Sequence, residues 1–185
     1  MLKKIYECCS TWFFGLILKK IYTMKKILIL SLVFFMSNAL MAQEKFNVYN
    51  PEADAKQEIE NAVKIAQNKN KHILIQVGGN WCGWCKLFYD LVTTDEEISK
   101  YLNENFEVVH LNYSKENSNL DVLETLDFPQ RFGFPVFVIL DKNGNRIHTQ
   151  NSAYLEEGKG HSPKKVLEFL KHWSPASIDP KSYKK

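Results

Sequence analysis

Cys82 and Cys85 are the residues of this sequence best suited to do chemistry. Three residues apart on a helix, their sulfurs would share a face and lie close enough to form a disulfide. One thiolate of such a pair attacks a disulfide in another molecule, and the second thiol then resolves the mixed disulfide. We expect Cys82 to attack and Cys85 to resolve.

The surrounding segment predicts how these cysteines are presented. It follows the β-rich run His72–Val77 and a Gly-Gly-Asn break, and it opens an expected helix. A helix N-terminus favours negative charge and lowers the pKa of a thiol there, here that of Cys82. Gly83 would let another polypeptide approach the sulfur, and Trp81 offers a flat apolar contact. Lys86 either supports the Cys82 thiolate with its charge or is an ordinary solvated helix lysine.

Two other interpretations of the cysteine pair are an inert structural disulfide and half of a zinc site. A scaffold held by disulfides would carry more cysteines at wider spacing. A zinc site needs two further Cys or His ligands, and the five histidines have no paired spacing: His72, His110, His148, His161 and His172. We therefore expect no metal, and no cofactor other than a redox-active Cys82–Cys85 disulfide.

The elements that must position the pair alternate along the chain. Apolar periodicity predicts helices over residues 51–68, 81–103 and 120–126, and a last helix that starts at 163. We expect the second helix to break near 93–95 and Ser162 to cap the last one. Strands are expected over 72–77, 106–113, 135–140 and 146–150. Asn143-Gly144 predicts a hairpin between the last two strands. We expect a loop over 151–162. Alternating helices and strands favour an α/β fold with parallel pairing and one antiparallel hairpin strand.

Two segments resemble the thioredoxin superfamily. Gly79–Lys86 resembles its active-site motif, especially in exported thioredoxin-like proteins with a Cys-Gly-Trp-Cys centre, and Arg131–Phe137 resembles its cis-proline segment. The resemblance implies a thioredoxin fold, a central mixed β-sheet flanked by helices. It also implies that the Phe134–Pro135 bond is cis, that Pro135 packs against the cysteines, and that the Phe134 backbone binds substrate peptide. We include Trp84 in that substrate face.

Three positions depart from the family pattern. Gln76 stands where thioredoxins have a buried acid, and His110 lies near the position of the strand lysine that pairs with that acid. Trp84 replaces the usual proline between the cysteines. The first two changes imply altered proton handling at Cys85, with water or Lys86 as helpers.

Residues 1–42 have the features of a leader. Met24-Lys25-Lys26 precedes the apolar run 27–40, and Ala42 offers a cleavage site before Gln43, as in a secretory signal. We expect translation to start at Met24, a domain over 43–174 and a frayed tail over 175–185. An uncleaved membrane anchor is the alternative. Without its leader the chain has 18 basic and 20 acidic residues, and this near-neutral balance argues against nucleic-acid binding.

These expectations combine into one functional hypothesis. The chain would be an exported, periplasmic thiol–disulfide oxidoreductase, or a membrane-anchored one facing the periplasm. It would act as a monomer that reduces or isomerises disulfides in proteins, with electrons from a membrane thiol-reductase. The alternatives are a dedicated oxidant and a non-catalytic peptide-binding module whose disulfide stays closed.

Overall fold

Four strands form the sheet that positions the cysteines: His72–Gly78 (β1), Phe106–Asn112 (β2), Val136–Leu140 (β3) and Arg146–Asn151 (β4). The computed structural model describes residues 25–26 and 46–184. The expected start at Met24 lies outside these residues, as does the leader apart from Lys25 and Lys26. The spatial order is β2-β1-β3-β4, so β1 and β3 are central and buried along their whole length.

The sheet is mixed, and one part of its pairing differs from our expectation. β2 runs parallel to β1, and β4 pairs antiparallel with β3 as the hairpin predicted. However, β3 is antiparallel to β1, with Val136 opposite Val77. β3 therefore starts at the same edge of the sheet at which β1 and β2 end. This reversal brings the residues after β1, after β2 and before β3 to one edge.

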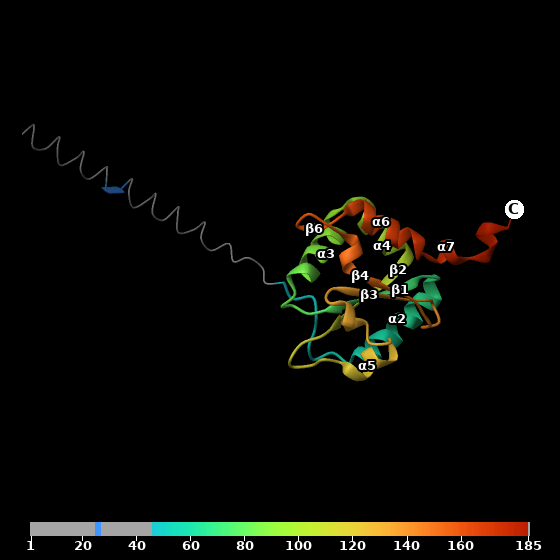
Figure 1. The fold of residues 1–185 in the computed structure, drawn as a ribbon, viewed down its shortest axis with the longest axis horizontal. Helices are drawn as coiled ribbons and strands as arrows, with labels where there is room; N and C mark the ends of the chain where they lie inside the picture. The colour runs from blue at the N-terminus through green and yellow to red at the C-terminus, as the bar shows by residue number, and fades with distance from the viewer. Residues whose placement is uncertain (1–24, 27–45, 185) are drawn as a thin grey trace, which may run out of the picture. The chain divides into compact units, whose positions relative to one another are not determined.

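Helices cover both faces of the sheet (Figure 1). Ala55–Lys69 (α2) and Leu120–Thr125 (α5) pack on one face, against Ile73, Ile75 and Val77 of β1. The other face, which includes Leu74, is covered by Gly83–Thr94 (α3), Glu96–Asn105 (α4) and Pro163–His172 (α6). Alternate residues of β1 thus belong to two separate apolar clusters, because successive strand side chains point to opposite faces.

Capping residues define the helix ends near the positions we predicted. Asp54 caps α2 by accepting a hydrogen bond from the Gln57 backbone N–H. Asp95 ends α3 and caps α4 through the Ile98 N–H, which confirms the predicted break. Ser162 stands at the N-cap position of α6, but its side chain makes no capping hydrogen bond.

Two segments that we expected to be irregular form short elements. Residues 151–162 contain a 3-10 turn, Ser152–Leu155 (η2), and a small antiparallel pair, Glu156–Glu157 (β5) and Gly160–His161 (β6). The predicted tail contains two four-residue elements, Pro175–Ile178 (α7) and Pro180–Tyr183 (η3), each with proline at its start. Proline favours a first turn because its φ is already helical. Among the described residues, no helix is both long and apolar enough to cross a membrane.

Candidate active site

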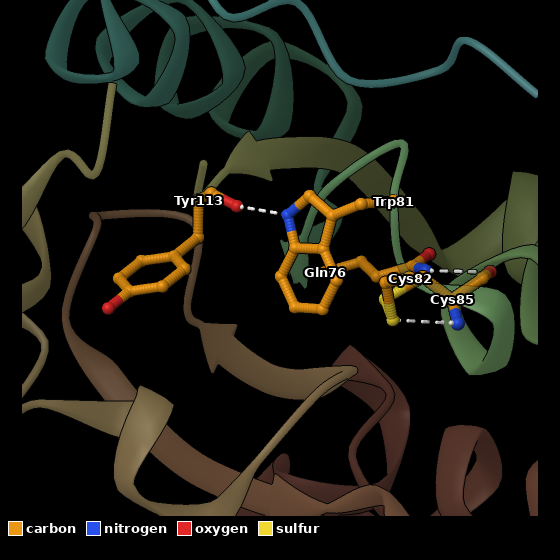
Figure 2. Close-up of a disulfide and its surroundings, with 5 residues drawn as sticks. All are labelled: Gln76, Trp81, Cys82, Cys85 and Tyr113. Atoms are coloured by element: carbon orange, nitrogen blue, oxygen red, sulfur yellow. Dashed lines mark hydrogen bonds between the residues drawn. A yellow bond between two sulfur atoms is a disulfide. The ribbon is translucent and has the colours of Figure 1, made fainter. Parts of the chain in front are cut away.

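Cys82 and Cys85 are joined by a disulfide at the N-terminus of α3 (Figure 2). Cys82 is the N-cap residue, and its Sγ accepts a hydrogen bond from the Cys85 backbone N–H at 3.1 Å. A helix N-terminus of this kind favours a thiolate on the Cys82 sulfur of a reduced pair, through free backbone N–H groups and the helix dipole. Cys82 thus lies at the helix N-terminus as we predicted, and its role as the attacking thiol stays a prediction.

Trp81 lies exposed beside the disulfide. Its side chain is 58% exposed, and its Nε1–H donates to the Tyr113 carbonyl oxygen at 2.8 Å (Figure 2). Its ring also meets Phe134 edge-on, with centroids 5.4 Å apart. Trp81 and residues 113–116 line a cavity of about 520 Å³. Trp81, the residue before Cys82, thus presents an exposed aromatic surface at this cavity.

The Phe134–Pro135 peptide bond is cis, as the resemblance implied. Pro135 is buried, and Phe134 packs against the cluster formed by Tyr49, Cys82 and Cys85. This contact depends on the antiparallel direction of β3, which starts at the edge where β1 ends.

The remaining predicted residues have clearly different surroundings. An added Cβ on Gly83 would meet no atom within 4 Å, so the space beside it is open. Trp84 is half-buried and meets the His161 ring edge-on at 5.5 Å. Lys86 pairs with Asp90 one turn along the helix, which favours the solvated-lysine interpretation. Its support of the Cys82 thiolate stays a prediction.

Gln76 lies under the pair, where its Nε2 donates to the Cys85 carbonyl oxygen at 3.2 Å. On the neighbouring strand it stands opposite His110. Burial lowers the pKa of His110 to about 4, so this imidazole is neutral at pH 7. Gln76 therefore anchors the α3 backbone and supplies no titratable group.

Tyr49 belongs to the site although its sequence position gave no signal. Its side chain is only 1% exposed and packs with both cysteines. The Asn80 side chain holds its backbone, accepting from the Tyr49 N–H at 3.0 Å and donating to the Tyr49 carbonyl at 2.7 Å. Burial raises the pKa of Tyr49, an effect that the nearby Gln76 partly offsets. No hydrogen bond of good geometry reaches the Tyr49 hydroxyl.

His161 is a second residue that the sequence did not indicate. It lies in β6, within the segment that we expected to be a loop, and packs edge-on against Trp84 and Phe88. Neither ring nitrogen has a hydrogen-bond partner, and burial lowers its pKa to about 4. Within the described part of the chain, no group of three or more His, Cys, Asp or Glu side chains is placed to hold a metal ion.

Comparisons with known proteins agree with this architecture. Residues 54–142 match a family model described as thioredoxin-like, whereas no curated protein sequence matches the chain. A disulphide isomerase from Xylella fastidiosa Temecula1 has a TM-score of 0.61 at 22% identity, over 68% of this chain and 95% of that one.

Two further solved structures are less similar. A DsbH oxidoreductase has a TM-score of 0.44 at 17% identity, over 71% of this chain and 90% of that one. A thioredoxin from Thermus thermophilus has a TM-score of 0.42 at 18% identity, over 61% of this chain and 81% of that one.

Proposed function

We propose that the protein is a thiol–disulfide oxidoreductase acting on disulfides in other proteins. It has the thioredoxin fold, and its residues 54–142 match a thioredoxin-like family model. One observation carries the proposal: the Cys82–Cys85 disulfide caps α3 next to an exposed tryptophan. The disulphide isomerase from Xylella fastidiosa shares the fold, and its name agrees with this class of reaction.

The reaction has two exchange steps. The Cys82 thiolate attacks one sulfur of the substrate disulfide, a Cys82–substrate bond forms, and the other substrate sulfur leaves as a thiolate. Cys85, as a thiolate, then attacks Cys82 Sγ, the Cys82–Cys85 bond forms, and the second substrate sulfur leaves. The substrate gains two electrons and the cysteine pair loses two. Isomerisation is the same first step followed by return of Cys82 through attack by a different substrate thiol.

We further propose that the protein is exported and works as a reductase or isomerase that receives electrons from a membrane thiol-reductase. The leader pattern of residues 24–42 supports export. The structure describes every residue between β2 and β3. The helices in this segment are the six-residue α5 and a four-residue 3-10 turn, Pro129–Phe132. Dedicated oxidants that resemble thioredoxin typically carry a helical insertion, so this short connection supports the proposal of a reductase or isomerase.

The experiment that tests the proposal is trapping with Cys85→Ser. Without its resolving thiol, the variant should accumulate mixed disulfides through Cys82 in the exported fraction of cells, visible as bands that disappear on reduction. Cys82→Ser is the matched control and should trap none. A passive binding module would trap none with either variant, and that result would overturn the proposal.

A second, separate experiment measures the reduction potential of the purified wild-type domain. A value near about −270 mV, as in thioredoxin, agrees with a reductase, whereas a value near about −120 mV is that of a strong oxidant and contradicts the proposed direction.

A further inference from the structure

The buried side of the disulfide contains an unpaired hydroxyl close to the resolving sulfur. A Cβ placed on Gly78, at the end of β1, would stand 2.4 Å from Cys85 Sγ and 2.8 Å from Tyr49 Oη. The sulfur and the hydroxyl oxygen thus flank one point above the Gly78 backbone, and their separation is at most the sum of these distances. Both side chains are fully buried.

This hydroxyl is an exception that calls for an explanation. A buried polar group without a partner costs about 1–3 kcal/mol, and buried polar groups in proteins nearly always have a partner. The disulfide sulfur of Cys85 is a poor acceptor. A thiolate sulfur at the same place carries a full negative charge, and hydrogen bonds to charged groups are about twice as strong as neutral ones.

We propose that the Tyr49 hydroxyl donates a hydrogen bond to the Cys85 thiolate when the pair is reduced, and that Tyr49 thereby tunes the resolving thiol. The inference rests on the proposed function, since it concerns the second exchange step. Tyr49 is a positioning residue, because it acts through Cys85 and does not contact substrate. Asn80, two residues before Cys82, holds the Tyr49 backbone with two hydrogen bonds and so fixes the ring under the active-site loop.

The other groups around this hydroxyl leave the role to Tyr49. Gln76 cannot titrate, and its Nε2 donates to the Cys85 carbonyl oxygen. Its side chain also lies near the Tyr49 hydroxyl and lowers the pKa of Tyr49, but no hydrogen bond of good geometry joins the two. His110 from β2 meets the Tyr49 ring edge-on at 5.6 Å, and it is neutral at pH 7 because burial lowers its pKa to about 4. Tyr89 from α3 also meets the His110 ring edge-on, with centroids 5.9 Å apart. A neutral donor, rather than a cation, therefore stabilises the charged sulfur.

The proton and electron balance of the step is simple. The Cys85 thiol releases its proton to water, and the Tyr49 hydroxyl keeps its own proton while sharing it with the sulfur. The thiolate then attacks Cys82 Sγ, the internal disulfide forms, and the substrate sulfur leaves with the electron pair. The hydrogen bond is lost when the disulfide closes, so Tyr49 favours the thiolate and not the product.

The test is Tyr49→Phe, which removes only the hydroxyl. Reduced protein reacts with one equivalent of Ellman's reagent in two steps: Cys82 releases the first thionitrobenzoate, and Cys85 releases the second. The pH profile of the second release reports the pKa of Cys85. We expect this pKa to rise by about one unit, the equivalent of about 1.4 kcal/mol. Below that pKa the thiolate fraction falls tenfold, and because nucleophilicity rises with pKa the second release slows only about threefold.

Tyr89→Phe is the matched control, since it removes a hydroxyl from a ring that also packs on His110. The control should leave both releases unchanged. The first release should be unchanged in Tyr49→Phe as well. Oxidised Tyr49→Phe should unfold at the same temperature as wild type or higher, because the hydroxyl has no partner in the oxidised protein.

Three outcomes separate the inference from the proposed function. An unchanged pKa of Cys85 in a folded Tyr49→Phe variant overturns the inference and leaves the function standing. A wild-type protein without the first release overturns the function. The third outcome comes from NMR of reduced wild-type protein, which tests the inference without any variant. The resonance of the Tyr49 hydroxyl proton should move downfield as Cys85 ionises, and a resonance that does not move contradicts the inference.

Discussion

At the scale of single residues, the two cysteines differ because their surroundings differ. Cys82 is 5% exposed and caps the helix, so solvent and a substrate sulfur reach it first. Cys85 is fully buried, and its sulfur and the Tyr49 side chain both lie beside Gly78. This asymmetry supports the division into an attacking and a resolving thiol, which spacing alone assigns only by analogy.

Trp81 carries the prediction that belongs to this scale. Trp81→Ala should lower kcat/KM about fivefold or more for a protein disulfide, because an aromatic contact contributes about 1 kcal/mol beyond the area it buries. The rate with Ellman's reagent should stay the same, because so small a disulfide does not need the tryptophan surface. Insulin reduction and the Ellman reaction measure the two rates.

The matched control for this prediction is Tyr183→Ala. Tyr183 is another exposed aromatic residue, 74% accessible, and lies in the C-terminal tail. It should change neither rate. Equal losses for the large and the small disulfide in Trp81→Ala would mean that the tryptophan supports the sulfurs rather than the substrate.

At the scale of elements, the site is made where three strand ends meet. Cys82 follows β1, Tyr113 follows β2 and Pro135 precedes β3, and the antiparallel direction of β3 places all three at one edge of the sheet. The close packing at this edge is most evident at Gly78, the last residue of β1, where a side chain would overlap Cys85 Sγ and Tyr49 Oη.

Gly78→Ala should therefore destabilise the oxidised protein by about 1–3 kcal/mol, the usual cost of overpacking a core. The loss would occur although glycine to alanine within a strand is otherwise favourable by about 0.5–1 kcal/mol. Gly83→Ala is the control, because its added methyl group meets no atom within 4 Å, and it should change stability by less than about 0.5 kcal/mol. Urea unfolding measures both, and similar values for the two variants would contradict the close packing at Gly78.

At the scale of the whole molecule, three histidines on different strands make stability depend on pH. Burial lowers the pKa of His72, and it acts in the same way on His110 and His161. Burial lowers the pKa of His110 and of His161 to about 4 in the folded protein, against about 6.5 in an unfolded chain. Between these values the unfolded chain binds more protons, so stability is full above about pH 6.5 and falls as the pH drops towards 4.

Thermal unfolding of the oxidised protein at pH 7 and pH 5 tests this dependence. We expect a lower Tm at pH 5. His161→Phe should reduce the difference, since it replaces an imidazole whose ring nitrogens have no partner by an apolar ring beside Trp84 and Phe88. Replacing the exposed His172 with Gln is the control and should leave the difference as in wild type. The assignment to His161 is wrong if its variant loses as much Tm as wild type does.

The sequence by itself determined the local features of this protein. The run His72–Val77 predicted β1, Asp95 predicted the break between two helices, and Asn143-Gly144 predicted the hairpin, because each depends on residues close together in the chain. The Cys82–Cys85 pair and the cis bond before Pro135 were also anticipated, the second through resemblance alone.

Only the tertiary structure decided which distant residues complete the site. Tyr49 lies 33 residues before Cys82, and His161 lies 76 residues after Cys85. Nevertheless, Tyr49 packs against both cysteines, and His161 packs against Phe88 of α3. The direction of β3 was decided in the same way, by where the chain re-enters the sheet. The physical reason is that spacing reports hydrogen bonds and faces within one element, whereas burial depends on how separate elements pack together.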